Sequence, residues 1–304
     1  MESIAPLVAA SINAGTPLML AALGLLINEK SGVVNLGAEG MMLVAAIVGF
    51  ATAVHTESVA LGFVTAACAG MLLAGFFALL TVWLGTNQYA TGLALSLFGG
   101  GASAYIGISF VGHSLENPKF AIPYLADIPF LGTALFRQHP MVYLSLLLVA
   151  GIVWFLYRSR SGLVLRAVGE SPSSAHALGY NVRLIRLAAL LFGGACCGLA
   201  GAFMSLVYTP MWVEGMVAGR GWIALALTTF ATWRPARVLV GAYLFGGVTI
   251  MTFHAQGLGV SIASQWLSMM PYLATILVLV LISTNANWIK LNMPASLGKN
   301  FHPQ

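Results

Sequence analysis

The sequence predicts an all-α integral membrane protein with about nine transmembrane segments, in one transmembrane domain over residues 1–304. Charged residues make up 7 % of the chain, whereas soluble domains carry about 25 %. Hydrophobic residues make up 59 %, and the mean hydropathy is +0.91. These values exclude a soluble domain, a disordered chain and a DNA-binding protein. The net charge of +5 indicates no nucleic-acid partner, because in a membrane protein the placement of basic residues matters more than their sum.

Charge-free windows place the segments, because about 20 apolar residues cross a bilayer. We expect them near 7–27, 33–54, 59–83, 91–111, 140–157, 187–208, 220–233, 238–254 and 262–282. The segment 220–233 is short enough to be a half-helix that does not cross fully. We expect the first segment to be retained, because a cleaved signal peptide has a basic start and the only early charge here is Glu2.

Basic residues set the orientation. Five arginines crowd the loop 158–186, which we therefore expect in the cytoplasm: Arg158, Arg160, Arg166, Arg183 and Arg186. Alternation from this loop puts ten basic residues inside and three outside. The N-terminus is then external and the C-terminus cytoplasmic.

Small residues recur every fourth position in two segments. The stripes are Gly62, Ala66, Gly70 and Ala74 in the third segment, and Gly194, Gly198 and Ala202 in the sixth. Such stripes let helix backbones approach closely in lipid. They favour tight helix packing or subunit dimerisation over a pore-lining groove.

The most polar stretch inside a predicted segment is NEKSGVVNLGAEGMM, residues 28–42. An ionised Glu39 at the centre of a membrane costs about 2.5–3.5 kcal/mol. Asn35 lies four residues earlier, so on a continuous helix both side chains would share one face. Neighbouring glycines indicate a broken or bent second helix. Asn35 and Glu39 either line a solute path or serve packing alone.

Two further polar spots are candidates for the same path. Asn87 and Gln88 lie between the third and fourth segments, where a simple cytoplasmic turn is the alternative. Arg220 begins the seventh segment beside two glycines, where it could meet a polar solute or a partner protein. It could equally form a surface ion pair with Glu214, which contributes little.

The loop 158–186 contains a short helix with clear boundaries. Ser171 is a good N-cap, Pro172 suits the first helical position, and Gly179 suits the residue after the end. We interpret this helix as a docking element for a cytoplasmic partner, with Ala175 and Ala177 on its contact face. The alternative is an interfacial helix lying on anionic headgroups.

Soluble-enzyme motifs are absent from the sequence. There is no GxxxxGK[ST] loop, no HExxH and no Cys/His cluster. We therefore expect no enzyme activity, no metal and no cofactor in this chain.

Several stretches in order resemble one known family. They are NEKSGVVNLGAEGMML, TNQYATGLALSLFG, LRAVGESPSSAHALGYNV and the run from GGACCGLAGAFMSL to AGRGWIALAL. They look like the permease subunits of bacterial ABC importers of the branched-chain amino acid and simple-sugar type. The resemblance covers roughly residues 15–285. Within that family the chain looks most similar to the shorter permease of nucleoside importers.

The resemblance implies a multi-pass protein of the bacterial inner membrane with three protein partners. These are a cytoplasmic ABC ATPase, a second, longer permease in a pseudo-symmetric pair, and a periplasmic or lipoprotein substrate-binding protein. It also implies that the helix Pro172–Leu178 is a coupling helix in the ATPase cleft, preceded by Arg166, Gly169 and Glu170.

The solute that the resemblance favours is a nucleoside, with simple sugars and branched-chain amino acids as alternatives. The predicted segments carry no basic residue near their middle, so a neutral polar molecule fits better than a phosphate-bearing one. A rival from another class is an ion-coupled secondary transporter. That class needs several ionisable groups inside the membrane, and the segments offer essentially one, Glu39.

Overall fold

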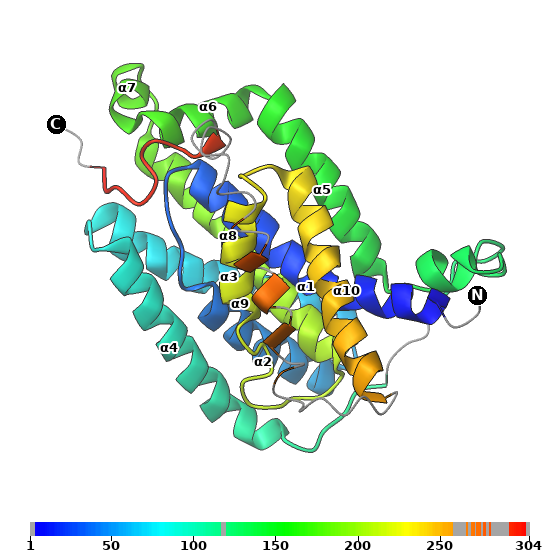
Figure 1. Ribbon diagram of the computed structural model, residues 1–304. Coiled ribbons are helices and arrows are strands. Elements are labelled where there is room, and N and C mark those ends of the chain that lie inside the picture. Colours follow the sequence, from blue (N-terminus) through cyan, green and yellow to red (C-terminus); the bar gives the residue numbers. More distant parts are fainter. Residues whose placement is uncertain are drawn as a thin grey trace.

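The computed structural model describes residues 4–116, 120–257, 292–301 and a few residues between 266 and 280. Within these residues the regular secondary structure is helical, which confirms the predicted all-α class (Figure 1). Seven helices of the described part are long and apolar enough to cross a membrane: Ile4–Lys30, Ala38–Thr56, Val59–Trp83, Gln88–Phe110, Pro140–Arg158, Val182–Tyr208 and Pro235–Gly257.

These seven helices match seven of the nine predicted segments. The predicted segment 220–233 is α9, Arg220–Phe230, which has 11 residues. At about 1.5 Å per residue it is about 16 Å long, too short for a hydrocarbon core of about 30 Å. The ninth predicted segment, 262–282, lies largely outside the described residues.

The structure contains ten α-helices in its described part, and the long ones coincide with these spans. They are α1 (Ile4–Lys30), α2 (Ala38–Thr56), α3 (Val59–Ala78), α4 (Gln88–Gly107), α5 (Pro140–Arg158), α6 (Arg160–Glu170), α7 (Pro172–Ala177), α8 (Val182–Phe203), α9 and α10 (Pro235–Gly257). One π-helical turn extends α3 to Trp83, and another extends α8 to Tyr208.

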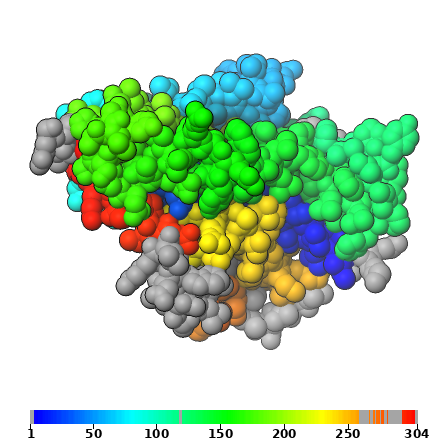
Figure 2. Space-filling view, turned by 90° about the horizontal axis from the view of Figure 1, so that it is seen from above, coloured from blue at the N-terminus to red at the C-terminus, as the bar shows by residue number. Residues whose placement is uncertain are grey.

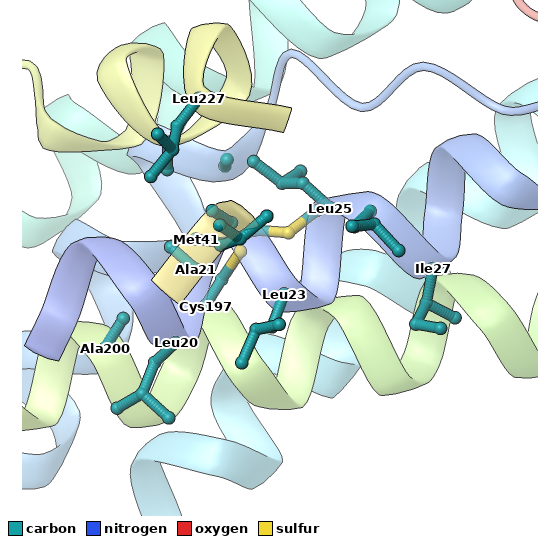
Figure 3. Packing of buried hydrophobic residues seen from close by; sticks show 14 of the residues in the cluster. Leu20, Ala21, Leu23, Leu25, Ile27, Met41, Cys197, Ala200 and Leu227 are labelled. Carbon is teal, nitrogen blue, oxygen red and sulfur yellow. The ribbon is translucent and has the colours of Figure 1, made fainter. Parts of the chain in front are cut away.

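Helix α1 forms the centre of the bundle. It packs against α8, α9 and α10, and most of its C-terminal two-thirds is buried. Figure 3 shows its side chains Leu20, Leu23 and Leu25 among Met41 of α2 and Cys197 of α8. Because apolar residues surround α1 on all sides, the helix needs no polar face.

The small-residue stripes join α3 to α8. A Cβ atom on Gly70 would lie 2.1 Å from the Gly194 carbonyl oxygen, and one on Gly198 would lie 2.3 Å from that of Ala66. Both contacts are far shorter than a real Cβ permits, so only glycine allows this approach. The prediction of tight packing is confirmed within the chain.

The loop 158–186 forms one end of the bundle. Helices α6 and α7 lie there beside the first turns of α8 (Figure 1), and the five arginines of 158–186 belong to this part of the chain. We call this the arginine-rich end. The described tail 292–301 lies against it, as Figure 2 shows by the contact of red with green.

Candidate functional site

The segment 31–37 joins α1 to α2 without helical structure and runs back into the bundle along α4. Val34 N–H donates to Gln88 Oε1 at 2.9 Å, at the start of α4. Further on, Ser96 Oγ donates to the Leu36 carbonyl at 2.8 Å. Gly99 packs against Gly40, where a Cβ would lie 2.5 Å from Gly40 Cα. We call 31–37 the re-entrant segment.

Helix α2 therefore begins well inside the bundle. Gly99 lies about 16 Å further along α4 than Gln88, at about 1.5 Å per residue. This is about half of a hydrocarbon core of about 30 Å. Irregular backbone at such a depth is tolerated only where protein or a polar cavity surrounds it. Here the Val34 N–H and the Leu36 carbonyl are satisfied by Gln88 and Ser96.

Asn35 lies in the re-entrant segment and is fully buried. Its Oδ1 accepts from Gly37 N–H at 2.9 Å, and its Nδ2 lies 3.6 Å from Met41 Sδ. Because α2 begins only at Ala38, the expected shared helix face of Asn35 and Glu39 is wrong. Asn35 instead stabilises the turn into α2.

Glu39 lies in the first turn of α2 and binds the start of α9. Its Oε1 accepts from Gly219 N–H at 2.8 Å, and its Oε2 accepts from Gly221 N–H at 2.7 Å. An N-terminal helix end leaves such N–H groups without helical partners and carries a partial positive charge. The carboxylate satisfies both needs, which explains how an acid is stable at this depth.

Glycine is required on the α9 side of this contact. Gly219 has φ +80, a left-handed conformation that glycine adopts without strain. A Cβ on Gly221 would lie 2.6 Å from both Cα and N of Glu39. The glycines on both sides of Arg220 thus let the α9 backbone come close to Glu39.

The other end of α9 is held by a second acid, Glu29 of α1. Glu29 Oε2 accepts from Thr228 Oγ1 at 3.0 Å and from Trp233 Nε1. Thr232 and Trp233 have φ values of 49 and 53, a strained conformation for such residues. Two carboxylates, Glu39 and Glu29, therefore fix the two ends of the half-helix.

Sequence reasoning missed Glu29. Glu29 falls just outside the predicted segment 7–27, yet Glu29 is 3 % and Lys30 8 % exposed. The signal that could have found it is that the polar triplet Asn28-Glu29-Lys30 follows the apolar run directly. No glycine or proline separates the two, so the helix can continue through Glu29. Its partners come from residues about 200 positions later in the sequence, so no local pattern shows them.

The remaining predicted path residues lie in different places. Arg220 stacks over the Tyr208 ring at 5.2 Å, and its Nη1 lies 3.4 Å from the Met216 carbonyl. Gln88 is buried beside the re-entrant segment. Asn87 is exposed at the arginine-rich end and caps α4 by accepting from Tyr89 N–H at 3.0 Å. Glu39 and Arg220 therefore lie where α2 meets α9, Asn35 and Gln88 lie along the re-entrant segment, and Asn87 lies at the arginine-rich end.

The predicted short helix in the loop 158–186 is α7. Ser171 caps it by accepting from Ser174 N–H at 3.3 Å, Pro172 is its first residue, and Gly179 has φ +88 after its end. A longer helix that the sequence did not indicate, α6, precedes it.

The candidate coupling residues divide into buried and exposed groups. Ala175 is 2 % exposed and packs with Val168 and Val182, so its expected place on an open contact face is wrong. Gly169 is also buried, where a Cβ would lie 2.1 Å from the Lys30 carbonyl. Exposed at the tip are Glu170, Ala177, Leu178, Gly179 and Tyr180. Arg166 is half-buried, with its guanidinium 5.6 Å from the centre of the Tyr157 ring.

A polar cavity of about 710 Å³ opens at the end opposite α7. Its polar lining comes from α1, from the stretch before α5 and from the end of α8: Asn13, Asp127, Arg137, His139 and Tyr208. Tyr208 also supports Arg220 at the start of α9. The cavity thus approaches the junction of α9 with Glu39.

The site as a whole offers hydrogen-bonding groups rather than reactive ones. Among the described residues, no group of three or more His, Cys, Asp or Glu side chains could hold a metal ion. Amides, hydroxyls, backbone N–H groups and a carboxylate meet where two irregular segments enter the bundle from opposite ends. Such groups can bind a polar solute weakly and release it.

Known proteins resemble this chain along most of its length. A putative glucose ABC transporter permease protein of Haloferax volcanii is 39 % identical and covers 99 % of both chains. A nucleoside ABC transporter permease protein of Lactococcus lactis is 31 % identical over 88 % of both. A guanosine ABC transporter permease protein of Bacillus subtilis is 30 % identical over 92 % of both. No solved structure matches the chain significantly.

A family model for the permease component of branched-chain amino acid transport systems matches residues 7–281. The match spans every candidate residue described above, from Asn35 to Arg220. The resemblance noted from the sequence is thereby confirmed: the chain is a permease component and belongs to the branched-chain amino acid transport system permease family.

Proposed function

We propose that the chain is the transmembrane subunit of an ATP-driven importer and forms half of the path for a neutral polar small molecule. The path uses Glu39, Asn35, Gln88 and Arg220. The importer further contains a cytoplasmic ATPase, a substrate-binding protein and a second, longer permease. It resides in the cytoplasmic membrane, with the arginine-rich end inside.

One observation carries this proposal beyond the family match. The re-entrant segment enters from the arginine-rich end, the stretch 209–219 enters from the opposite end, and the two meet at Glu39. Discontinuous helices that meet near the midplane are typical of transporter solute sites. A neutral solute could be bound there by hydrogen bonds alone, in place of the Glu39 contacts with the α9 backbone, so the site needs no buried ion pair.

The solute is a nucleoside or a simple sugar. Both are neutral and rich in hydroxyl groups, which suits amide and hydroxyl partners. Two of the relatives above are named for nucleosides or guanosine, and the 39 % identical one for glucose. The sugar is therefore a second candidate beside the nucleoside that the sequence favours. Arg220 is already occupied by Tyr208 and backbone carbonyls, which disfavours a phosphate-bearing solute.

Helix α7 is the contact for the ATPase. It is short, capped, exposed at its tip and placed among arginines at the predicted cytoplasmic end. Leu178 and Tyr180, 77 % and 44 % exposed, supply apolar contact area there. Because exposed apolar side chains beside charges are typical of protein interfaces, this tip suits a protein partner better than lipid headgroups.

The polar cavity at the opposite end is the entrance. It lies on the side to which a substrate-binding protein delivers solute, and Tyr208 links it to Arg220. Solute then passes Glu39 when the two permease halves rock about their interface.

The test is uptake by cells that express the full set of subunits. Labelled adenosine, uridine and glucose are offered in turn, with unlabelled ribose, leucine and nucleoside monophosphates as competitors. We expect uptake of a nucleoside or glucose that monophosphates do not inhibit, and copurification of an ATPase with the chain. Competition by monophosphates alone contradicts the proposed solute, and inhibition by leucine alone assigns the path to amino acids.

A further inference from the structure

The tail 292–301 is bonded to the unit formed by α6 and α7. Ser296 N–H and Ser296 Oγ both donate to the Gly169 carbonyl, at 3.1 and 2.6 Å. The Phe301 ring meets the His176 ring of α7, with 5.6 Å between centroids. Phe301 also packs against the small cluster of Val168, Ala175 and Val182, which anchors α7. Any displacement of α7 therefore acts on the tail.

The same tail is bonded to the start of the re-entrant segment. Gly298 N–H donates to the Gly32 carbonyl at 3.1 Å. Arg186, 2 % exposed, donates through Nε to the Ser31 carbonyl and through Nη1 to the Lys299 carbonyl, both at 3.2 Å. Lys30 Nζ donates to the Asn292 carbonyl at 2.7 Å.

Asn300 extends this connection to the middle of the re-entrant segment. Its Nδ2 donates to the carbonyls of Gly85 at 2.6 Å and Thr86 at 3.2 Å, just before α4. Its Oδ1 accepts from Gln88 Nε2 at 3.2 Å. Gln88 uses its other end, Oε1, to accept from Val34 N–H at 2.9 Å. The Gln88 side chain thus joins Asn300 of the tail to the backbone of the re-entrant segment.

The re-entrant segment depends on such external bonds. A helix fixes its own backbone through internal hydrogen bonds, whereas in the middle of this segment the Val34 N–H and the Leu36 carbonyl are bonded to side chains of α4 instead. The position of the segment follows the groups that hold it, among which the tail, Arg186 and Gln88 act at the arginine-rich end. Further along, the chain leads into α2 and to Glu39, which holds α9.

We propose that the tail 292–301 transmits the displacement of α7 to the re-entrant segment, with Gln88 and Asn300 as positioning residues. The inference rests on the proposed function, in which an ATPase acts on α7. It adds a route from that contact through Asn300 of the tail to Gln88, a residue of the proposed solute path. Physical connection alone does not establish coupling, so the experiment measures coupling itself.

The experiment uses the complete importer in proteoliposomes and measures ATP hydrolysed and solute transported in the same preparation. The variants are Gln88→Leu, Asn300→Ala and the double variant. Gln88→Glu is added because it keeps an acceptor for Val34 and loses the donor to Asn300. Met293→Ala is the matched control, since this side chain is exposed on the same tail.

We expect each single variant to keep ATPase association, unfolding temperature and hydrolysis within about twofold, and to lower uptake about 5- to 20-fold, as for a typical coupling between sites. The double variant should transport no less than Asn300→Ala alone, because both changes break one connection. Gln88→Glu should match Asn300→Ala, and Met293→Ala should match the wild type.

Other results overturn the inference. Unchanged uptake by Asn300→Ala contradicts it. A loss of uptake in the double variant equal to the product of the two single losses also contradicts it. Parallel losses of unfolding temperature, ATPase association and uptake assign these residues a structural role only. Failure of the proposed function looks different, because the wild-type chain itself then neither copurifies with an ATPase nor transports with ATP, and that result removes both proposals.

Discussion

Both oxygen atoms of the Glu39 carboxylate accept a backbone N–H from the start of α9. Hydrogen bonds to a charged group contribute about 1.5–3 kcal/mol each, and a helix N-terminus adds up to about 2 kcal/mol in buried geometries. These gains offset the cost of about 2.5–3.5 kcal/mol for an acid inside the membrane. A single residue therefore joins α2 to α9.

Replacing Glu39 tests this joint. Glu39→Gln keeps one oxygen acceptor, so we expect the fold to persist and uptake to fall moderately. Glu39→Leu leaves the N–H groups of Gly219 and Gly221 without an acceptor, at about 1–3 kcal/mol each. It should lower the unfolding temperature and reduce uptake much further. Normal uptake by Glu39→Leu would show that the carboxylate serves packing alone.

At the scale of elements, α9 is a half-helix whose ends are fixed by acids from two other helices. Glu39 holds its N-terminus, and Glu29 accepts from Thr228 and Trp233 near its C-terminus. Since its 11 residues do not cross the membrane, these two contacts fix its depth together with its packing against α1, α2 and α10. Changes at either contact should shift the start of α9 relative to α2.

Gly221→Ala changes one of these contacts by a single methyl group. The new Cβ would lie 2.6 Å from the Glu39 backbone, which no side-chain movement relieves. We expect a loss of about 1–3 kcal/mol of stability from overpacking, together with reduced uptake. The control is Gly101→Ala on exposed α4, where a Cβ meets nothing within 4 Å. Equal uptake by both variants contradicts a close α2–α9 contact during transport.

Helix α7 is the second element with a testable role. Ala177→Glu places a charge on its exposed tip, so we expect loss of ATPase copurification and of uptake while the protein stays folded in the membrane. Ala175→Glu is a different test, because that residue is buried against Val168 and Val182 and its replacement disrupts the fold.

The control for Ala177→Glu makes the same change at the opposite end of the molecule. Ala60 is exposed in the first turn of α3, where a glutamate is compatible with the helix. Ala60→Glu should bind the ATPase as the wild type does. Retained ATPase binding in Ala177→Glu would exclude α7 from the interface.

Local sequence patterns correctly predicted the helices, because hydropathy and capping depend on residues that are neighbours in the sequence. Apolar windows located the seven long helices, and Ser171, Pro172 and Gly179 predicted α7. The shared face of Asn35 and Glu39 was predicted wrongly, because the spacing rule assumes a helix that here begins only at Ala38. The partners of Glu29 and Gln88 could not be predicted, because they come from distant parts of the chain.

For the whole molecule, the bundle combines rigid and irregular parts. Tight glycine contacts lock α3 to α8, and α1 fills the centre. The re-entrant segment and the stretch 209–219 interrupt this packing and meet at Glu39. A rigid frame around two discontinuous segments fits a permease that alternates between outward and inward openings. The source of energy for that alternation is the central question.

The most direct measurement supplies either ATP or an ion gradient to proteoliposomes that contain the chain with the proposed ATPase and the proposed second permease. ATP is placed on the α7 side and a binding protein loaded with labelled solute on the other side. The account predicts that the labelled solute then accumulates on the α7 side. This accumulation should be unchanged when proton and sodium gradients are dissipated. Accumulation that follows a proton or sodium gradient without ATP hydrolysis would contradict it and make the chain an ion-coupled transporter.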